Sequence, residues 1–219
     1  MNGTRIALVA LVAACAWGAW PKRAVVVDTH STTRQFVIRS TLARVDDAIV
    51  ILGDSIVEAS TLPRALCGHP IVNAGIGGAS TASNLGAMLS QALGGKRAAL
   101  IVVSLGTNDA AMPLGVAQYR SNYLTLLTEL AALTLRRAVL AIPPPEAGLP
   151  EAKKVSGDLI DSFNAILPDL VKEAGATFIP LPGMPEHHTL DGIHLDATGY
   201  GVWDKAILGG IESALCKLS

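Results

Sequence analysis

Short apolar runs alternate along this chain with longer segments in which apolar residues recur at helical spacing. The apolar runs occupy residues 48–52, 70–72, 98–105, 137–142 and 177–181. Runs of this kind, with almost no charge inside them, are typical of strands that are buried on both faces of a sheet. The pattern therefore predicts five strands.

The segments between these runs carry the spacing of amphipathic helices. They predict helices over residues 55–66, 81–93, 116–133, 155–174 and 196–218, and 35–45 could form one more. Strands that alternate with helices indicate a parallel sheet with helices on both faces. We expect an α/β domain over residues 48–219, preceded by a polar lead-in at 21–47.

The first twenty residues differ from the rest and predict export. Arg5 precedes residues 6–20, an uncharged run that is short for a membrane span and suits a signal-peptide core. Residues 14–16 form an Ala-Cys-Ala cleavage-like site, while Cys15 could instead be the lipidated cysteine of a bacterial lipobox. An uncleaved membrane anchor remains open, and a buried N-terminal helix is the remaining alternative. We expect any membrane attachment to be through this segment.

Charge and cysteine content narrow the class of protein further. The net charge is −1, from 17 basic and 18 acidic residues without a basic block, so no nucleic-acid partner is expected. Cys67 precedes the second strand and Cys216 ends the last helix, which places both at the edge of the sheet opposite the strands' carboxyl ends. In an exported protein we predict a disulfide between them; two small buried side chains are the alternative.

Polar clusters follow the strands at their carboxyl ends, where parallel sheets bind ligands. The first strand ends in Gly-Asp-Ser at 53–55, the second in Asn-Ala-Gly-Ile-Gly-Gly at 73–78, and the third in Gly-Thr-Asn-Asp at 106–109. The loop after the fifth strand holds Asp-Gly-Ile-His at 191–194. We therefore expect these four clusters to meet at one rim, bordered by the loops at 110–115 and 143–154.

Acyl transfer needs the residue types that these clusters supply. A serine such as Ser55 becomes nucleophilic when a base such as His194 takes its proton, and Asp191 could orient that imidazole. The backbone N–H of Gly78 and the side-chain amide of Asn108 could donate to the oxyanion. Each cluster alone is a weak signal, because turns are rich in these residues. The combination, in order and at strand ends, predicts a serine acyl-hydrolase.

The four clusters resemble the SGNH hydrolase family, the GDSL-type esterases and lipases. The resemblance implies a flavodoxin-like three-layer α/β/α sandwich around the parallel five-stranded sheet. It also implies a Ser55–His194–Asp191 triad and an oxyanion hole formed by Ser55 N–H, Gly78 and Asn108. This chain has Leu195 where many members carry proline, and Ala-Ser at 79–80 where several have Asp-Thr, so the subfamily stays open.

Other residues also suggest alternative chemistry. His187 and His188, with Asp191 and His194, could bind zinc, but they lack a helical i, i+4 pair, and we predict no metal. The chain has no G-x-S-x-G elbow. Two other serines are poor nucleophile candidates: Ser104 lies in a buried strand, and Ser80 suits a helix N-cap.

The sequence therefore predicts an exported carboxylic-ester hydrolase that forms an acyl-enzyme on Ser55. It would need no cofactor and act on a small-molecule, glycan or lipid ester. Two alternatives stay open: an O-acyltransferase that uses the same residues on a glycan, and a binding module without turnover.

Overall fold

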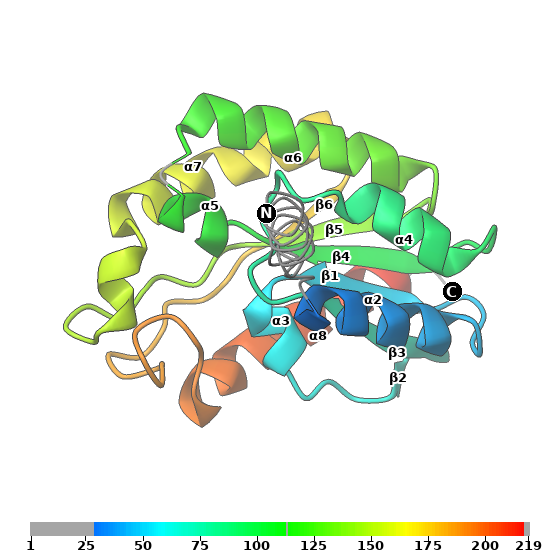
Figure 1. Ribbon diagram of the computed structural model, residues 1–219, viewed down its shortest axis with the longest axis horizontal. Helices are drawn as coiled ribbons and strands as arrows, with labels where there is room; N and C mark the ends of the chain where they lie inside the picture. Colours follow the sequence, from blue (N-terminus) through cyan, green and yellow to red (C-terminus); the bar gives the residue numbers. More distant parts are fainter. Residues whose placement is uncertain (1–28, 113, 217–219) are drawn as a thin grey trace, which may run out of the picture.

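The computed structural model describes residues 29–112 and 114–216, which fold around one six-stranded sheet (Figure 1). The strand order is β2-β3-β1-β4-β5-β6, and every neighbouring pair is parallel except β2 with β3. The strands are β1 (Ile49–Gly53), β2 (Ala65–Leu66), β3 (His69–Gly75), β4 (Leu100–Ser104), β5 (Arg137–Leu140) and β6 (Thr177–Ile179). The predicted targeting segment, residues 1–20, lies outside the described residues.

Helices cover both faces of this sheet and complete an α/β/α sandwich. The helices are α2 (Thr29–Leu42), α3 (Ser55–Ala59), α4 (Leu85–Leu93), α5 (Thr107–Ala111), α6 (Val116–Ala131), α7 (Gly157–Glu173) and α8 (Ala197–Leu215), with a 3₁₀ turn at Glu151–Lys154. One face packs against α2, α4, α6 and α7, and the other against α3 and α8. Figure 1 shows α8, in orange and red, on the face opposite α6 and α7.

The alternation of side chains along β1 explains why the strand is apolar throughout. Val50 and Leu52 join the core beneath α2, α4, α6 and α7, whereas Ile49 and Ile51 join the core beneath α8. All four side chains are fully buried. Successive residues of a strand point to opposite faces, so a strand covered on both sides has no polar position.

The sixth strand is a correction to the five-stranded prediction, and it arises because the helix predicted at 55–66 is shorter. α3 ends at Ala59, and Ser60 is already extended, with ψ of 146°. Pro63 has no N–H for a helical hydrogen bond and disfavours helix at the residue before it. The chain runs extended instead, and Ala65 and Leu66 pair antiparallel with β3.

A second correction concerns α4, which begins at Leu85 instead of Thr81. The backbone N–H and hydroxyl of Thr81 both donate to the buried carboxylate of Asp109, so Thr81 is bound outside a helix. Ser80 is not the helix N-cap, because Asn84 occupies that position. The sequence pattern did not predict α5, a helix of five residues that is separated from β4 by two residues.

The lead-in segment contributes α2, which packs against β3 and α4. This helix starts six residues before the predicted 35–45 segment. Ile38 and Leu42 are its buried residues, whereas Phe36 is 61% exposed.

The predicted link between Cys67 and Cys216 is present as a disulfide with a Cα–Cα distance of 5.5 Å. It ties the turn before β3 to the end of α8. Among the described helices, none combines the length and apolar character needed to cross a membrane.

Candidate active site

Sheet register brings the first three polar clusters together. Gly53, at the end of β1, pairs with Gly75 of β3 on one side and Ser104 of β4 on the other. The three following loops therefore start side by side. Gly75 is required there because a Cβ would collide with the backbone of Glu58. Ser55 follows β1 as the first residue of α3 and is half-buried.

A continuous hydrogen-bonded relay joins Ser55 to the loop after β6. Ser55 Oγ lies 3.0 Å from Nε2 of His194, and Nδ1 of His194 lies 2.7 Å from Oδ2 of Asp191. The other carboxylate oxygen of Asp191 accepts the backbone N–H groups of Ile193 and His194, both at 2.9 Å. Partial burial opposes ionisation, but these hydrogen bonds lower the pKa of Asp191 below 3.8. Asp191 is thus a carboxylate fixed against the imidazole.

The two candidate oxyanion donors also lie at this rim, on facing turns. Asn108, the second residue of α5, donates its side-chain N–H to the carbonyl of Ala79 at 2.9 Å. Because the amide has two N–H groups, one remains for another acceptor. Gly78 has a φ of 79°, a conformation that favours glycine, and its backbone N–H donates no hydrogen bond to any of the described residues.

Two buried carboxyls support the loops without facing solvent. Asp109 accepts the N–H and hydroxyl of Thr81, which fastens the second cluster to α5. Asp54 caps α3 by accepting the N–H of Ile56 at 2.9 Å. Burial raises the pKa of Asp54 to about 7, and burial likewise raises the pKa of Asp109. Neither aspartate was among the candidate site residues predicted from the sequence.

The loop that carries Asp191 and His194 is fastened by Glu146, which sequence reasoning missed. One carboxylate oxygen of Glu146 accepts the backbone N–H groups of His188 and Thr189, both at 2.9 Å, and the hydroxyl of Thr189 at 2.8 Å. These hydrogen bonds, with that of the His187 side chain, lower the pKa of Glu146 to about 2. The only sequence signal was its place in the proline-rich loop at 143–154.

Backbone hydrogen bonds extend the same attachment. The N–H of Glu146 donates to the carbonyl of Gly192, and the N–H of Glu151 donates to the carbonyl of Asp191. Gly192 has a φ of 111° and packs too closely against Ala152 for a side chain. The proline-rich loop at 143–154 therefore supports the loop that carries Asp191 and His194, here called the DxxH loop, through several backbone contacts.

The histidines that had suggested zinc point to other partners. His188 is buried, and its two ring nitrogens lie 2.8 Å and 3.1 Å from the carbonyl oxygens of Pro185 and Pro144. His187 bonds Glu146. Within the described ranges, no three His, Cys, Asp or Glu side chains are placed to hold a metal ion. Ser104 is buried, as predicted for a residue inside a strand, and Ser80 is buried as well.

A cavity of about 260 Å³ adjoins the oxyanion side of the site. Gly77, Gly78 and Ala79 form one wall, while α2 contributes Ser31 and Gln35 to another. α4 closes it with residues that include Leu85 and Met88. α2 therefore lines space that opens beside Gly78.

Comparison with known protein families shows which family this chain is related to. The GDSL-like lipase/acylhydrolase family model matches residues 51–202. The chain belongs to this family. The resemblance read from the four sequence clusters is thereby confirmed, and this GDSL-like protein is an enzyme of the esterase and acylhydrolase type.

Solved structures show the same fold. A Streptococcus pneumoniae protein provisionally assigned as a platelet activating factor is 23% identical, with a TM-score of 0.64 over 95% of this chain and 99% of its own. An acetylxylan esterase from Geobacillus stearothermophilus is 15% identical, with a TM-score of 0.59 over 75% and 94%. A lipase/acylhydrolase from Enterococcus faecalis is 22% identical, with a TM-score of 0.59 over 77% and 96%. A search of curated proteins gave no match.

Proposed function

We propose that this enzyme hydrolyses carboxylic esters through an acyl-enzyme on Ser55. The observation that carries the proposal is the relay from Asp191 Oδ2 to His194 Nδ1 at 2.7 Å and from His194 Nε2 to Ser55 Oγ at 3.0 Å. With the Nδ1 proton donated to Asp191, Nε2 keeps its lone pair for the serine proton. His194 is then the base and Asp191 the residue that orients it.

The reaction follows from this arrangement in two halves. Ser55 Oγ attacks the ester carbonyl while its proton moves to Nε2 of His194. The resulting oxyanion accepts N–H groups from Gly78, Asn108 and the Ser55 backbone, which as the first residue of a helix has no helical acceptor. The C–O bond to the alcohol breaks, and His194 returns the proton to the leaving oxygen. Water then repeats the sequence on the acyl-enzyme and releases the acid.

Labelling and turnover test this assignment together. A fluorophosphonate probe is expected to label Ser55, and Ser55→Ala is expected to abolish both labelling and hydrolysis of p-nitrophenyl acetate. Ser90→Ala, at an exposed position on α4, is the matched control and should behave like the native enzyme. Labelling or turnover that survives in Ser55→Ala would overturn the proposal.

Hydrolysis of p-nitrophenyl esters also tests the metal requirement and the substrate preference. We propose that catalysis needs no metal, so dialysis against EDTA should leave turnover intact; loss with recovery on adding zinc would contradict this. Because a protein of the same fold is an acetylxylan esterase, acetylated xylan belongs in the substrate series beside p-nitrophenyl esters of increasing length. Acyl transfer to an added glycan that exceeds hydrolysis would favour a transferase.

We also propose that the enzyme is exported. The uncharged run at 6–20 and the Cys67–Cys216 disulfide support this, because disulfides persist in oxidising compartments. Cell fractionation followed by N-terminal sequencing would distinguish a cleaved signal, a lipidated Cys15 and a retained anchor. Recovery of the whole chain, with free thiols, from the cytosol would contradict export.

A further inference from the structure

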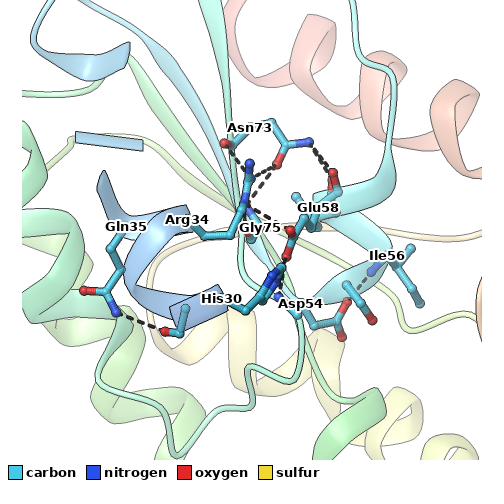
Figure 2. Close-up of polar contacts among 12 residues, drawn as sticks. His30, Arg34, Gln35, Asp54, Ile56, Glu58, Asn73 and Gly75 are labelled. Atoms are coloured by element: carbon cyan, nitrogen blue, oxygen red, sulfur yellow. Dashed lines mark hydrogen bonds and ion pairs between the residues drawn. The ribbon is translucent and has the colours of Figure 1, made fainter. Parts of the chain in front are cut away.

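The helix α2 lies outside the family match at 51–202, yet it reaches the loop that carries Gly78. Its Arg34 donates from Nε to the carbonyl of Gly75 at 3.0 Å. The same guanidinium lies 3.5 Å from the carbonyl and 3.3 Å from the side-chain oxygen of Asn73. Figure 2 shows Arg34 between α2 and the end of β3. A cation from α2 thus holds the backbone where β3 ends and the loop begins.

Glu58 of α3 holds the same loop by the opposite charge. Its Oε2 accepts the N–H of Gly77 at 2.6 Å and lies 3.1 Å from Nε2 of His30. Its Oε1 lies 3.3 Å from Nε of Arg34. In Figure 2 the Glu58 carboxylate lies between Arg34 and His30. The side chains of Arg34 and Glu58 are about four-fifths buried, at 19% and 20% exposed, so water screens this pair less than a surface pair.

The two charged side chains bind the backbone of Gly75 and Gly77, in addition to the hydrogen bonds that Ile76 between them makes to Gly53 and Ala79. Gly75 offers its carbonyl to Arg34, Gly77 offers its N–H to Glu58, and Gly78 follows. Glycines adopt more backbone conformations than other residues, so the direction of the Gly78 N–H depends on what anchors its neighbours. On the far side, Ala79 is anchored by Asn108. The residue before Gly78 is therefore held by the Arg34–Glu58 pair, here called the ionic clamp, and the residue after it by the Asn108 amide.

We infer that Arg34 of α2 and Glu58 of α3 are positioning residues of the oxyanion hole. The inference rests on the proposed function, because it requires Gly78 to donate to the oxyanion. Hydrogen bonds to ionised groups are stronger than neutral ones, so the pair suits a loop that must hold one geometry as charge develops. His30 adds a third contact to Glu58 at the exposed edge of the clamp.

Kinetics of matched variants test the inference. Arg34→Ala and Glu58→Ala are expected to lower kcat by roughly 10- to 100-fold with KM within about twofold, because a donor displaced by a fraction of an ångström stabilises the transition state less than the bound substrate. Arg39→Ala removes the same charge from an exposed position of the same helix and should leave kcat unchanged. Arg34→Lys should lose less than Arg34→Ala, and added guanidinium should restore part of the activity of Arg34→Ala.

Two further measurements separate positioning from stability. Affinity for an alkylboronic acid, which forms a tetrahedral adduct on serine, should fall by about the same factor as kcat/KM. Rates are expressed per active site titrated with the fluorophosphonate probe, so that unfolded protein does not count. If the variants have fewer titratable active sites but a normal kcat per site, the positioning role is overturned and only a structural role remains.

The failure of this inference differs from the failure of the proposed function. If Ser55→Ala is inactive but Arg34→Ala and Glu58→Ala keep kcat within about twofold, the clamp has no catalytic role and the triad stands. If Ser55→Ala keeps its activity, the proposed function fails first, and this inference with it.

Discussion

Replacing the buried Asp54 with asparagine should change how stability depends on pH. Asp54 is 2% exposed, and burial raises its pKa from 3.8 to about 7. A carboxyl with a raised pKa binds its proton more tightly in the folded state, so its contribution to stability is full below the unfolded pKa and is lost as pH rises through the folded one. The window for Asp54 runs from about pH 4 to pH 7.

The size of the effect follows from the two pKa values. Linkage over that window gives a loss of about 2–3 kcal/mol between pH 5 and pH 8 from this one group. It is an upper bound, because a buried site can admit water or relax as the carboxylate forms. In Asp54→Asn the amide oxygen can still accept the N–H of Ile56 at the helix N-cap, where asparagine and aspartate are equally favourable. The variant therefore keeps the N-cap of α3 but has no group at this position that can ionise.

Urea denaturation at pH 5, 6, 7 and 8, followed by circular dichroism, measures the difference. The free energy of unfolding of the native enzyme should fall across this range more steeply than that of Asp54→Asn. Asp169→Asn, which makes the same change at an exposed site on α7, should run parallel to the native enzyme. A curve for Asp54→Asn that also runs parallel would refute the buried, protonated carboxyl.

Three other outcomes are expected. Asn108→Ala should lower kcat by roughly 10²–10³ and change KM little, because its amide serves the oxyanion and not the ground state; steady-state kinetics with near-normal kcat would remove it from the site. Glu146→Ala should free the loop of Asp191 and slow fluorophosphonate labelling, whereas Glu146→Gln, which keeps an acceptor, should slow it less. Labelling of both variants at the rate of the native enzyme would contradict a role of Glu146 in holding that loop. Reducing the Cys67–Cys216 disulfide, which spans 149 residues, should lower the free energy of unfolding by up to about 5 kcal/mol in the chain-entropy model, and a double Cys→Ser variant should show the same value without reductant.

The features that sequence predicted well were those set by local patterns. The apolar runs located β1, β3, β4, β5 and β6 because the central part of a strand covered on both faces is apolar, whereas polar residues such as His69 and Asn73 of β3 lie outside the run. The register of parallel neighbours then brings strand ends to one edge, and this is why the four clusters could be placed together. The short β2 was missed because its residues, Ala65 and Leu66, pair only through the turn at Cys67 and Gly68.

The features that sequence missed depend on contacts between distant segments. Glu146 lies in a loop without periodicity, and its partners are about 40 residues further along the chain. Arg34 lies on a helix whose mixed polarity gave no clear apolar stripe, and its acceptors are about 40 residues away. Ionic side chains at such positions read as ordinary surface charges, because nothing local marks the backbone groups that they will bind.

The disulfide has a consequence for the integrity of the chain under proteolysis. Residues 182, 183 and 185–187, before the DxxH loop, are exposed, and a single cut there would divide the enzyme into two pieces. Cys67 would remain with the piece that holds Ser55, and Cys216 with the piece that holds His194, so the bond would keep the two joined. A nicked enzyme would migrate as one species without reductant and as two with it, and Ser55 and His194 could not diffuse apart.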